Sequence, residues 1–273
     1  MRSTKWMLLL LAVVVAAVLY MVFHGAGRNR RVVNVVGSTS IQPFAEILAE
    51  EFNSQGAIDV EVQGGGSTQG VTSALNGTAD IGTCSRNLKD QEREEGLTPV
   101  TIAYDGLAVV VNPANGLDNL TRQQVRDIFT GTVTDWGQVG GQPGPIRVIT
   151  REEGSGTREA FTGMIMGDHR ISRKAITQPS NGTVKELVRH DPNAIGYMSL
   201  GIVEASPDLK ALKIDGVVAS VDNVTQKTYK LVRPFLFLVK GTPADDAQKF
   251  IDYVLGPSGQ AKLRQEGLIP AAP

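Results

Sequence analysis

Hydrophobic residues along the chain recur with two alternating periods. Runs that are β-branched, apolar or alternating predict strands at residues 32–36, 58–62, 79–85, 146–149, 194–198 and 234–239. Apolar residues spaced three and four positions apart predict helices at residues 41–52, 71–75, 121–129, 160–165 and 247–255. No period of about 20–50 residues recurs, which argues against a repeat protein. The alternation of strands and helices predicts an α/β architecture with mainly parallel sheets.

Local signals mark several helix ends. Pro43 falls in the first turn of a predicted helix, where its missing N–H does little harm. Asn76-Gly77 is typical of a helix C-terminus. Thr121 and Gln124 have the spacing of a capping box, so a helix is expected to begin just after Thr121.

The N-terminal region differs from the rest of the chain. Arg2 and Lys5 precede an uncharged apolar run of 18 residues, 6–23. This length suffices for a membrane span and exceeds the usual apolar part of a signal peptide. No cysteine follows the run, so a lipid anchor is excluded. We interpret residues 1–31 as an export signal retained as a membrane anchor, with cleavage near residues 25–27 as the alternative.

Composition narrows the possible functions. The 273 residues carry a formal net charge of −1, which argues against sequence-independent nucleic-acid binding. Three histidines and one cysteine are too few for a zinc cluster, so no metal site is expected. The lone Cys84 excludes an intramolecular disulfide and is expected to be a small buried side chain.

Three junctions share one pattern, in which a strand leads through a Gly/Ser/Thr turn into an amphipathic helix. The turns are GSTS at 37–40, GGGSTQG at 64–70 and GSGT at 154–157. Helix N-termini present unpaired N–H groups and partial positive charge, so each turn is a candidate anion site. One such turn by itself is ordinarily only an N-cap. Three of them, with Arg151 four residues before Ser155, favour a convergent oxyanion site.

Enzymatic alternatives lack essential residues. A nucleophile elbow needs Gly-x-Ser-x-Gly, but Glu153 replaces the first glycine around Ser155. His169 and His190 lie in polar stretches that are typical of a surface. The chain contains no Gly-Lys pair for a phosphate-binding NTPase loop and no dinucleotide fingerprint in the right setting. We therefore predict a protein that is not an enzyme and has no cofactor.

Together these motifs resemble the phosphate-binding component of bacterial phosphate ABC importers. The resemblance rests on VVGSTSIQPFAEILAEEF, GGGSTQGVTSALNGTADIGTCSR and REEGSGTREAF, with DGLAVVVNP, LTRQQVRDIFTG, NAIGYMSLG and GQAKLRQEGLIPA in order along residues 32–270. It implies a two-lobed periplasmic-binding-protein fold of type II, with two chain crossovers and ligand between the lobes. Lobe 1 would take residues 32–108 and 233–273, and lobe 2 would take 109–232.

The resemblance also implies the ligand-binding residues. Matched to this sequence, they are Thr39, Ser40, Ser67, Asp80, Arg151, Ser155, Gly156 and Thr157. This chain departs from the family by lacking a lipid-accepting cysteine and by having Ser40 where some members have phenylalanine. Two of these residues have simpler explanations: Arg151 could pair with Glu152 or Glu153 at the surface, and Asp80 could cap a strand end.

The charged residues beside the third turn, GSGT, are not expected to contact the ligand. Glu153, Arg158 and Glu159 are expected to affect the helix terminus and the surface rather than the ligand. Asp80 is expected to select phosphate over sulfate, because a carboxylate only accepts hydrogen bonds and sulfate has no proton to give.

The implied function is high-affinity binding of inorganic phosphate outside the cytoplasmic membrane and its delivery, by a monomer, to the permease subunits of an ABC importer. Nucleic acid is not an expected partner. Three alternatives stay open: a membrane-tethered oxyanion sensor or adaptor, a binding protein for sulfate or molybdate, and a phosphate-ester hydrolase that uses Ser155.

Overall fold

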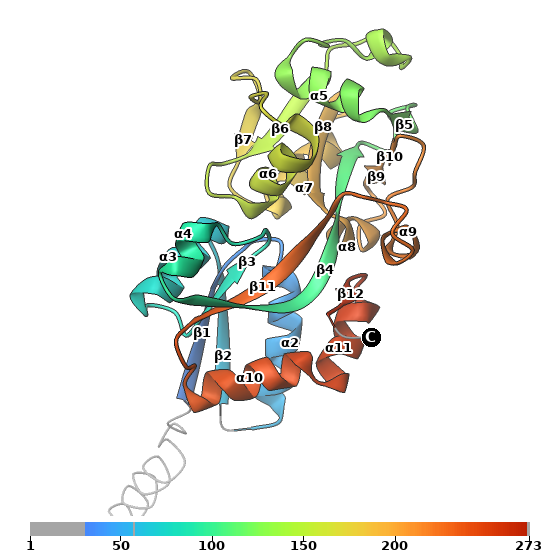
Figure 1. Ribbon diagram of the computed structural model, residues 1–273. Coiled ribbons are helices and arrows are strands. Elements are labelled where there is room, and N and C mark those ends of the chain that lie inside the picture. Colours follow the sequence, from blue (N-terminus) through green and yellow to red (C-terminus); the bar gives the residue numbers. More distant parts are fainter. Residues whose placement is uncertain (1–30, 57, 272–273) are drawn as a thin grey trace, which may run out of the picture.

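The computed structural model describes residues 31–56 and 58–271, which form two bodies connected by long strands (Figure 1). Strand β4 (Leu97–Val111) and strand β11 (Val232–Lys240) run side by side through the junction. We call the body that contains β1, β2 and β3 lobe 1 and the body that contains β6, β7 and β8 lobe 2.

The strands and helices alternate along most of the chain. The other strands are β1 (Arg31–Gly37), β2 (Ile58–Gly64), β3 (Ile81–Cys84), β5 (Asn119–Leu120), β6 (Arg147–Arg151), β7 (Ile176–Gln178), β8 (Ala194–Ser199), β9 (Lys210–Ala211), β10 (Lys213–Ile214) and β12 (Ile269–Pro270). The helices are α2 (Gln42–Ser54), α3 (Ser67–Asn76), α4 (Asp90–Glu94), α5 (Arg122–Thr130), α6 (Gly156–Phe161), α7 (Asn181–His190), α8 (Leu200–Glu204), α9 (Val221–Thr225), α10 (Asp245–Leu255) and α11 (Pro257–Gln265). A 3₁₀-helix, η1 (Trp136–Val139), and a π-helix, η2 (Thr162–Met166), complete the elements.

The sheet topology shows that strand β4 takes part in the sheets of both lobes. Strand order is β2-β1-β3-β11-β4 in lobe 1 and continues β4-β8-β6-β7 in lobe 2. Strands β1, β2 and β3 are parallel, as are β6, β7 and β8. Both strands at the junction are antiparallel to their neighbours. The α/β class is confirmed, but the expectation of mainly parallel sheets is wrong because the crossing strands make each sheet mixed.

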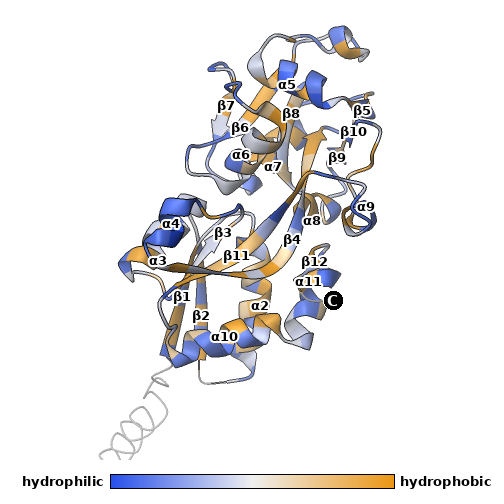
Figure 2. Cartoon of the chain, viewed as in Figure 1, coloured by the Kyte–Doolittle hydropathy of each residue, from blue (hydrophilic) through white to orange (hydrophobic). Residues whose placement is uncertain are grey.

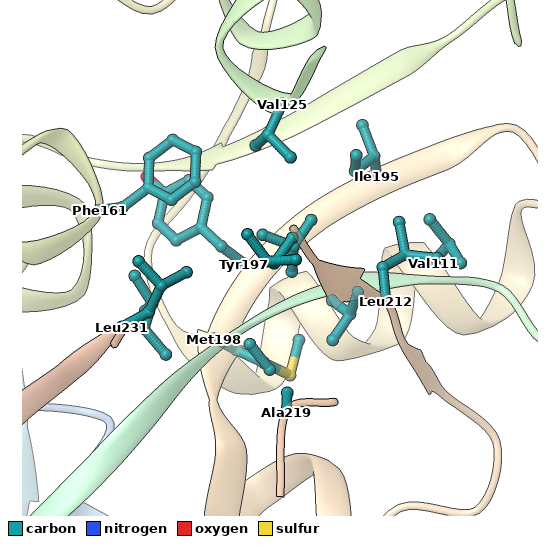
Figure 3. Close-up of a cluster of buried hydrophobic side chains, with 14 of the residues drawn as sticks. Val111, Val125, Phe161, Ile195, Tyr197, Met198, Leu212, Ala219 and Leu231 are labelled. Atoms are coloured by element: carbon teal, nitrogen blue, oxygen red, sulfur yellow. The ribbon is translucent and has the colours of Figure 1, made fainter. Parts of the chain in front are cut away.

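Each lobe has its own hydrophobic core, and apolar segments are found in both lobes (Figure 2). The core of lobe 2 packs around the C-terminal half of β4 and around β6 and β8, and Figure 3 shows part of it. The core of lobe 1 packs α2 and α10 against the sheet. A smaller cluster under α3 includes Cys84, which is fully buried as expected. Burial raises the pKa of the Cys84 thiol.

The helix-end signals correspond to observed caps. Thr121 accepts a hydrogen bond from the backbone N–H of Gln124, and both halves of the capping box are present. Gly77 ends α3 with φ of 69°, the left-handed conformation that glycine adopts without strain. Pro43 lies in the first turn of α2. The long strand β4 and helix α7 were not predicted, although α7 begins with a capping box formed by Ser180 and Thr183.

The lobe boundaries at residues 32–108, 233–273 and 109–232 stay a prediction. The apolar run at 6–23 lies outside the described residues. Within residues 31–56 and 58–271, no helix is long and apolar enough to cross a membrane.

Candidate functional site: a polar cluster between the lobes

The three Gly/Ser/Thr turns meet between the lobes. The turns before α2 and α3 follow β1 and β2, and the turn before α6 follows β6. Because parallel strands place their carboxyl ends at one edge of a sheet, each turn lies on the side of its lobe that faces the other lobe. The backbone N–H of Thr68 donates to the carbonyl of Gly154 across the interface at 3.0 Å. The lobes are therefore in direct contact here, and the structure is a closed form.

Lobe 1 contributes hydroxyl groups that are fully buried. Ser40, Ser67 and Ser85 each have no exposed surface. Ser67 is the first residue of α3, and its Oγ accepts a hydrogen bond from the backbone N–H of Ser85 at 3.0 Å. The Ser67 and Ser85 hydroxyl oxygens are 3.3 Å apart. The turn before α3 and the end of β3 thus present hydroxyls at one place.

Lobe 2 contributes the start of α6. Ser155 is the N-cap, and its Oγ accepts from the backbone N–H of Arg158 at 3.3 Å. The hydroxyl of Thr157 lies 2.7 Å from the Ser40 hydroxyl of lobe 1. Ser155 and Thr157 are each 1% exposed. Two hydroxyls from different lobes therefore share a hydrogen bond in the interior.

Arg151 is buried at the end of β6, with 1% of its surface exposed. Its Nε and Nη2 donate to the two carboxylate oxygens of Glu152 at 2.9 and 2.8 Å. Its backbone N–H donates to the Tyr197 hydroxyl at 3.2 Å. The Tyr197 ring stacks on Phe161 of α6 at 4.0 Å between ring centroids, as Figure 3 shows. The lobe 2 core thus positions both β6 and α6. The pairing of Arg151 with Glu152 is present, with Arg151 buried and Glu152 28% exposed.

Asn181, the first residue of α7, connects Arg151 to lobe 1. Its side chain is fully buried. With the amide oxygen assigned toward the guanidinium, that oxygen accepts from Arg151 Nη1 at 2.9 Å, from Ser40 Oγ at 2.9 Å and from Thr39 Oγ1 at 3.2 Å. In this orientation the amide oxygen accepts from all three donors. In the opposite orientation the amide NH₂ group would face the Arg151 guanidinium, donor against donor.

A second buried guanidinium, Arg233, lies where the strands cross. Arg233 on β11 is directly opposite Asp105 on β4. Its Nε and Nη2 donate to one Asp105 oxygen at 3.0 and 2.8 Å. Its Nη1 donates to Thr157 Oγ1 at 2.8 Å, and its Nη2 donates to Ser40 Oγ at 3.1 Å. Arg233 therefore joins both lobes to the hinge strands.

Burial acts on both members of this pair. Asp105 is fully buried and Arg233 is 1% exposed. Burial raises the pKa of the Asp105 carboxyl, and the neighbouring Arg233 charge opposes that rise. Burial likewise lowers the pKa of Arg233, and Asp105 opposes the fall. The hydroxyl of Ser199 donates to the other Asp105 oxygen at 2.8 Å, so the carboxylate has partners on both oxygens.

The hydroxyls of the cluster share a hydrogen-bonding arrangement. Each accepts from an N–H of the protein: Ser40 and Thr157 from Arg233, Ser67 from Ser85, and Ser155 from Arg158. A hydroxyl that accepts still has its own hydrogen to donate; here Ser40 donates it to the Asn181 amide oxygen, so an anion would have to replace that acceptor. Two guanidiniums and a set of hydroxyl donors in a buried place can bind an oxyanion. We call these residues the polar cluster: Ser40, Ser67, Ser85, Arg151, Ser155, Thr157, Asn181 and Arg233.

The assignment of Asp80 to the site is wrong. Asp80 is exposed and precedes β3, and one of its carboxylate oxygens accepts from the backbone N–H of Asn34 at 2.8 Å. The residue that lies in the cluster is Ser85, at the other end of the same strand. Because the strand separates its two ends, Asp80 faces the opposite edge of the sheet. It caps a strand end, which was the simpler explanation.

The other predicted residues come together. Ser40, Ser67, Arg151, Ser155 and Thr157 are buried in the cluster. Thr39, half-buried, is at its edge through Asn181. Gly156 lies opposite Ser67.

Sequence reasoning missed Arg233, Asp105, Asn181 and Ser85. Arg233 and Asp105 could have been noticed because each is a charged residue within a mostly apolar strand. The sequence gives a weaker indication for Asn181, because Ser180 is a typical N-cap residue and Asn181 is the first residue of the helix that follows.

Within the described residues, the structure adds no side chain that would support a metal site or a catalytic base. In the described part of the chain, no three His, Cys, Asp or Glu side chains are grouped to hold a metal ion. His169 and His190 are exposed, as expected. Neither histidine is hydrogen bonded to a cluster hydroxyl among the contacts of residues 31–56 and 58–271.

Replacing Gly156 by alanine should block closure of the lobes. A Cβ at this position would lie 2.2 Å from Ser67 Oγ and 2.8 Å from Ser85 Oγ. We expect at least about a tenfold loss of anion affinity, because every closed molecule would have to displace these hydroxyls. Calorimetry measures the loss. Gly163→Ala on η2 is the control, since a Cβ there meets nothing within 4 Å. Equal affinities of the two variants would contradict this reasoning.

The double crossover and the buried polar cluster define a two-lobed substrate-binding protein. A family model described as a PBP superfamily domain matches residues 24–258. The phosphate-binding protein PstS of Bacillus subtilis is 30% identical over 240 residues, covering 86% of this chain and 79% of that protein. PstS of Pseudomonas aeruginosa is 30% identical over 266 residues, covering 86% and 81%.

Solved structures agree with these relatives. A putative phosphate ABC transporter substrate-binding protein from Clostridium perfringens, determined with bound phosphate, is 38% identical with a TM-score of 0.85 and covers 88% of this chain and 100% of that one. An ABC-type phosphate transport receptor from Vibrio cholerae is 38% identical with a TM-score of 0.72, covering 87% and 99%. The chain belongs to the PBP superfamily and, within it, to the PstS family of binding proteins, with the type II fold expected from the sequence.

Proposed function

We propose that this protein binds inorganic phosphate at the polar cluster and delivers it to the permease subunits of an ABC importer. The observation that carries the proposal is the convergence of buried donors from both lobes on one place. The similar protein from Clostridium perfringens was solved with phosphate bound. The proposed ligand-binding residues are Thr39, Ser40, Ser67, Arg151, Ser155, Gly156 and Thr157, with Ser85, Asn181 and Arg233 added.

Charge accounting describes how the site would hold an anion. Glu152 pairs with Arg151, and Asp105 pairs with Arg233, so each cation already has a carboxylate partner. The anion is then balanced by hydroxyl hydrogens, backbone N–H groups and the remaining guanidinium donors rather than by a net positive charge. Such donors act strongly in a buried place because little water screens them.

The mechanism we propose is closure of the lobes around the ligand. Residues 32–108 with 233–273, and residues 109–232, would move as two bodies about the crossing strands. An anion that receives donors from both lobes binds the closed form more tightly than the open form, and so shifts the equilibrium toward closure. The closed, loaded monomer is what the permease would recognise.

Calorimetry of the full-length chain against phosphate, arsenate, sulfate and molybdate tests the ligand. We expect strong binding of phosphate. Tighter binding of sulfate or molybdate would assign the site to that anion instead. Because Asp80 lies outside the cluster, Asp80→Asn should leave the order of the four anions unchanged.

The family is one of substrate-binding proteins, and such proteins work outside the cytoplasm. A tethered sensor would share the same site, so its partners distinguish it. Co-purification with permease subunits supports delivery, whereas co-purification with a kinase supports sensing.

We propose that residues 6–23 stay attached as a membrane anchor. The full apolar run should then hold the protein in the membrane fraction after a high-salt wash, because salt weakens only electrostatic attachment. Mass spectrometry of the mature protein should find residue 6. A soluble mature chain that begins near residue 28 would show cleavage instead.

A further inference from the structure

A charged cluster joins the two lobes beside the polar cluster. Glu159 lies on α6 of lobe 2, and one of its carboxylate oxygens, Oε2, is 3.0 Å from Arg86 Nε and 3.1 Å from Lys89 Nζ. Arg86 and Lys89 belong to the segment of lobe 1 that connects β3 to α4. This contact between the lobes goes beyond the expectation that Glu159 affects the helix terminus and the surface.

The lobe 1 side of this contact is held rigidly. Arg86 is 5% exposed, and its Nη1 and Nη2 donate to the two oxygens of Glu92 at 2.8 Å each. Burial opposes the charged form of Arg86, but the hydrogen bonds with Glu92 and the neighbouring negative charges, Glu159 among them, together raise the pKa of Arg86. The guanidinium is therefore a fixed charge, and its Nε edge faces lobe 2.

Both partners are directly attached to the ligand-binding residues. Arg86 follows Ser85 in the chain, and Glu159 follows Gly156 by three residues and Thr157 by two on the same helix. A movement that brings Thr157 to Ser40 must also bring Glu159 to Arg86. Closure over the ligand and formation of this contact are thus one rigid-body step.

The contact also borders a groove. This groove of about 300 Å³ is lined by Arg86, Lys89 and Glu159, and Arg233 of β11 is also among its lining residues. Glu159 is 29% exposed and Lys89 is 59% exposed, so the ion pairs lie at the solvent side.

We propose that Glu159, with Arg86 and Lys89, forms a latch that holds the lobes closed and sets how long the bound anion stays. The proposal rests on the proposed function for its ligand. The latch touches no ligand atom; it stabilises the closed form alone, because its two halves separate when the lobes open. It therefore slows dissociation without changing the association of the anion with the open form.

Glu159→Gln should accelerate phosphate dissociation about threefold to tenfold, the range for a partly exposed ion pair with one buried partner, and leave the association rate unchanged. Glu153→Gln is the matched control, since Glu153 is exposed and has no ion pair among the described residues. Both variants remove one negative charge near the anion. General electrostatics predicts slower dissociation for both, which is opposite in sign to the latch. Unchanged or slower dissociation from Glu159→Gln would overturn the proposal.

A second measurement needs no ligand. Spin labels at the exposed Thr72 of lobe 1 and His169 of lobe 2 report the distance between the lobes in the full chain. Without ligand, Glu159→Gln should populate the closed distance less than wild type and Glu153→Gln should not. An identical distance distribution in all three proteins would refute the latch. If calorimetry finds no phosphate binding, the proposed function fails, and this distance measurement still decides the latch.

Discussion

Replacing Arg151 by alanine should weaken phosphate binding by about 2–5 kcal/mol, the usual effect of removing one partner of a buried hydrogen-bonded charge pair. Arg151 is the cation attached to the turn that carries Ser155 and Thr157, and it holds the side chain of Asn181. The alanine variant loses these donors and leaves Glu152 without its partner near an anion. Calorimetry with phosphate measures the loss.

The fold should survive this change. Glu152 is 28% exposed, so water can solvate its carboxylate once Arg151 is gone. Arg147→Ala is the matched control, because Arg147 lies on the same strand and pairs with Asp191 at the surface. We expect wild-type affinity from the control and the same far-ultraviolet circular dichroism from all three proteins. A folded Arg151→Ala variant with wild-type affinity would remove Arg151 from the site.

Replacing Asp105 by alanine should lower the free energy of unfolding by about 3–5 kcal/mol, because Arg233 would then be a buried charge without a counterion. The two residues face each other on the strands that cross between the lobes. Urea denaturation measures the loss. Asp208→Ala is the control, since Asp208 pairs with Arg189 where both side chains are more than a third exposed. That pair should contribute at most about 1 kcal/mol.

A double variant separates stability from binding. Asp105→Leu with Arg233→Met removes both charges and keeps similar volume, so most of the lost stability should return. Phosphate binding by the double variant should nevertheless be weaker than in wild type, because Thr157 and Ser40 lose the guanidinium that orients their hydroxyls. A double variant with recovered stability and wild-type phosphate affinity would mean that Arg233 supports the fold without taking part in binding. A double variant no more stable than Asp105→Ala would refute the charge argument.

Sequence alone determined the features that depend on residues close together in the chain. Apolar spacing predicted β1, α2, β6 and α10, and the capping box at Thr121 predicted where α5 begins. The three Gly/Ser/Thr turns predicted an oxyanion site, because each turn places its own hydrogen-bond donors at the start of a helix, close to the end of a strand. The resemblance carried by those turns led to the correct family and fold class.

Only the tertiary structure decided which distant residues complete the site. Arg233 and Asp105 are 128 positions apart in the chain, and they meet because β11 returns antiparallel to β4. Asn181 reaches Ser40 of the other lobe over 141 positions. Asp80 and Ser85 stand five positions apart, yet only Ser85 faces lobe 2, because β3 sends its two ends to opposite edges of the sheet. Local patterns encode helices, strands and turns, whereas contacts between the lobes depend on how the strands cross, and no short stretch of sequence encodes that crossing.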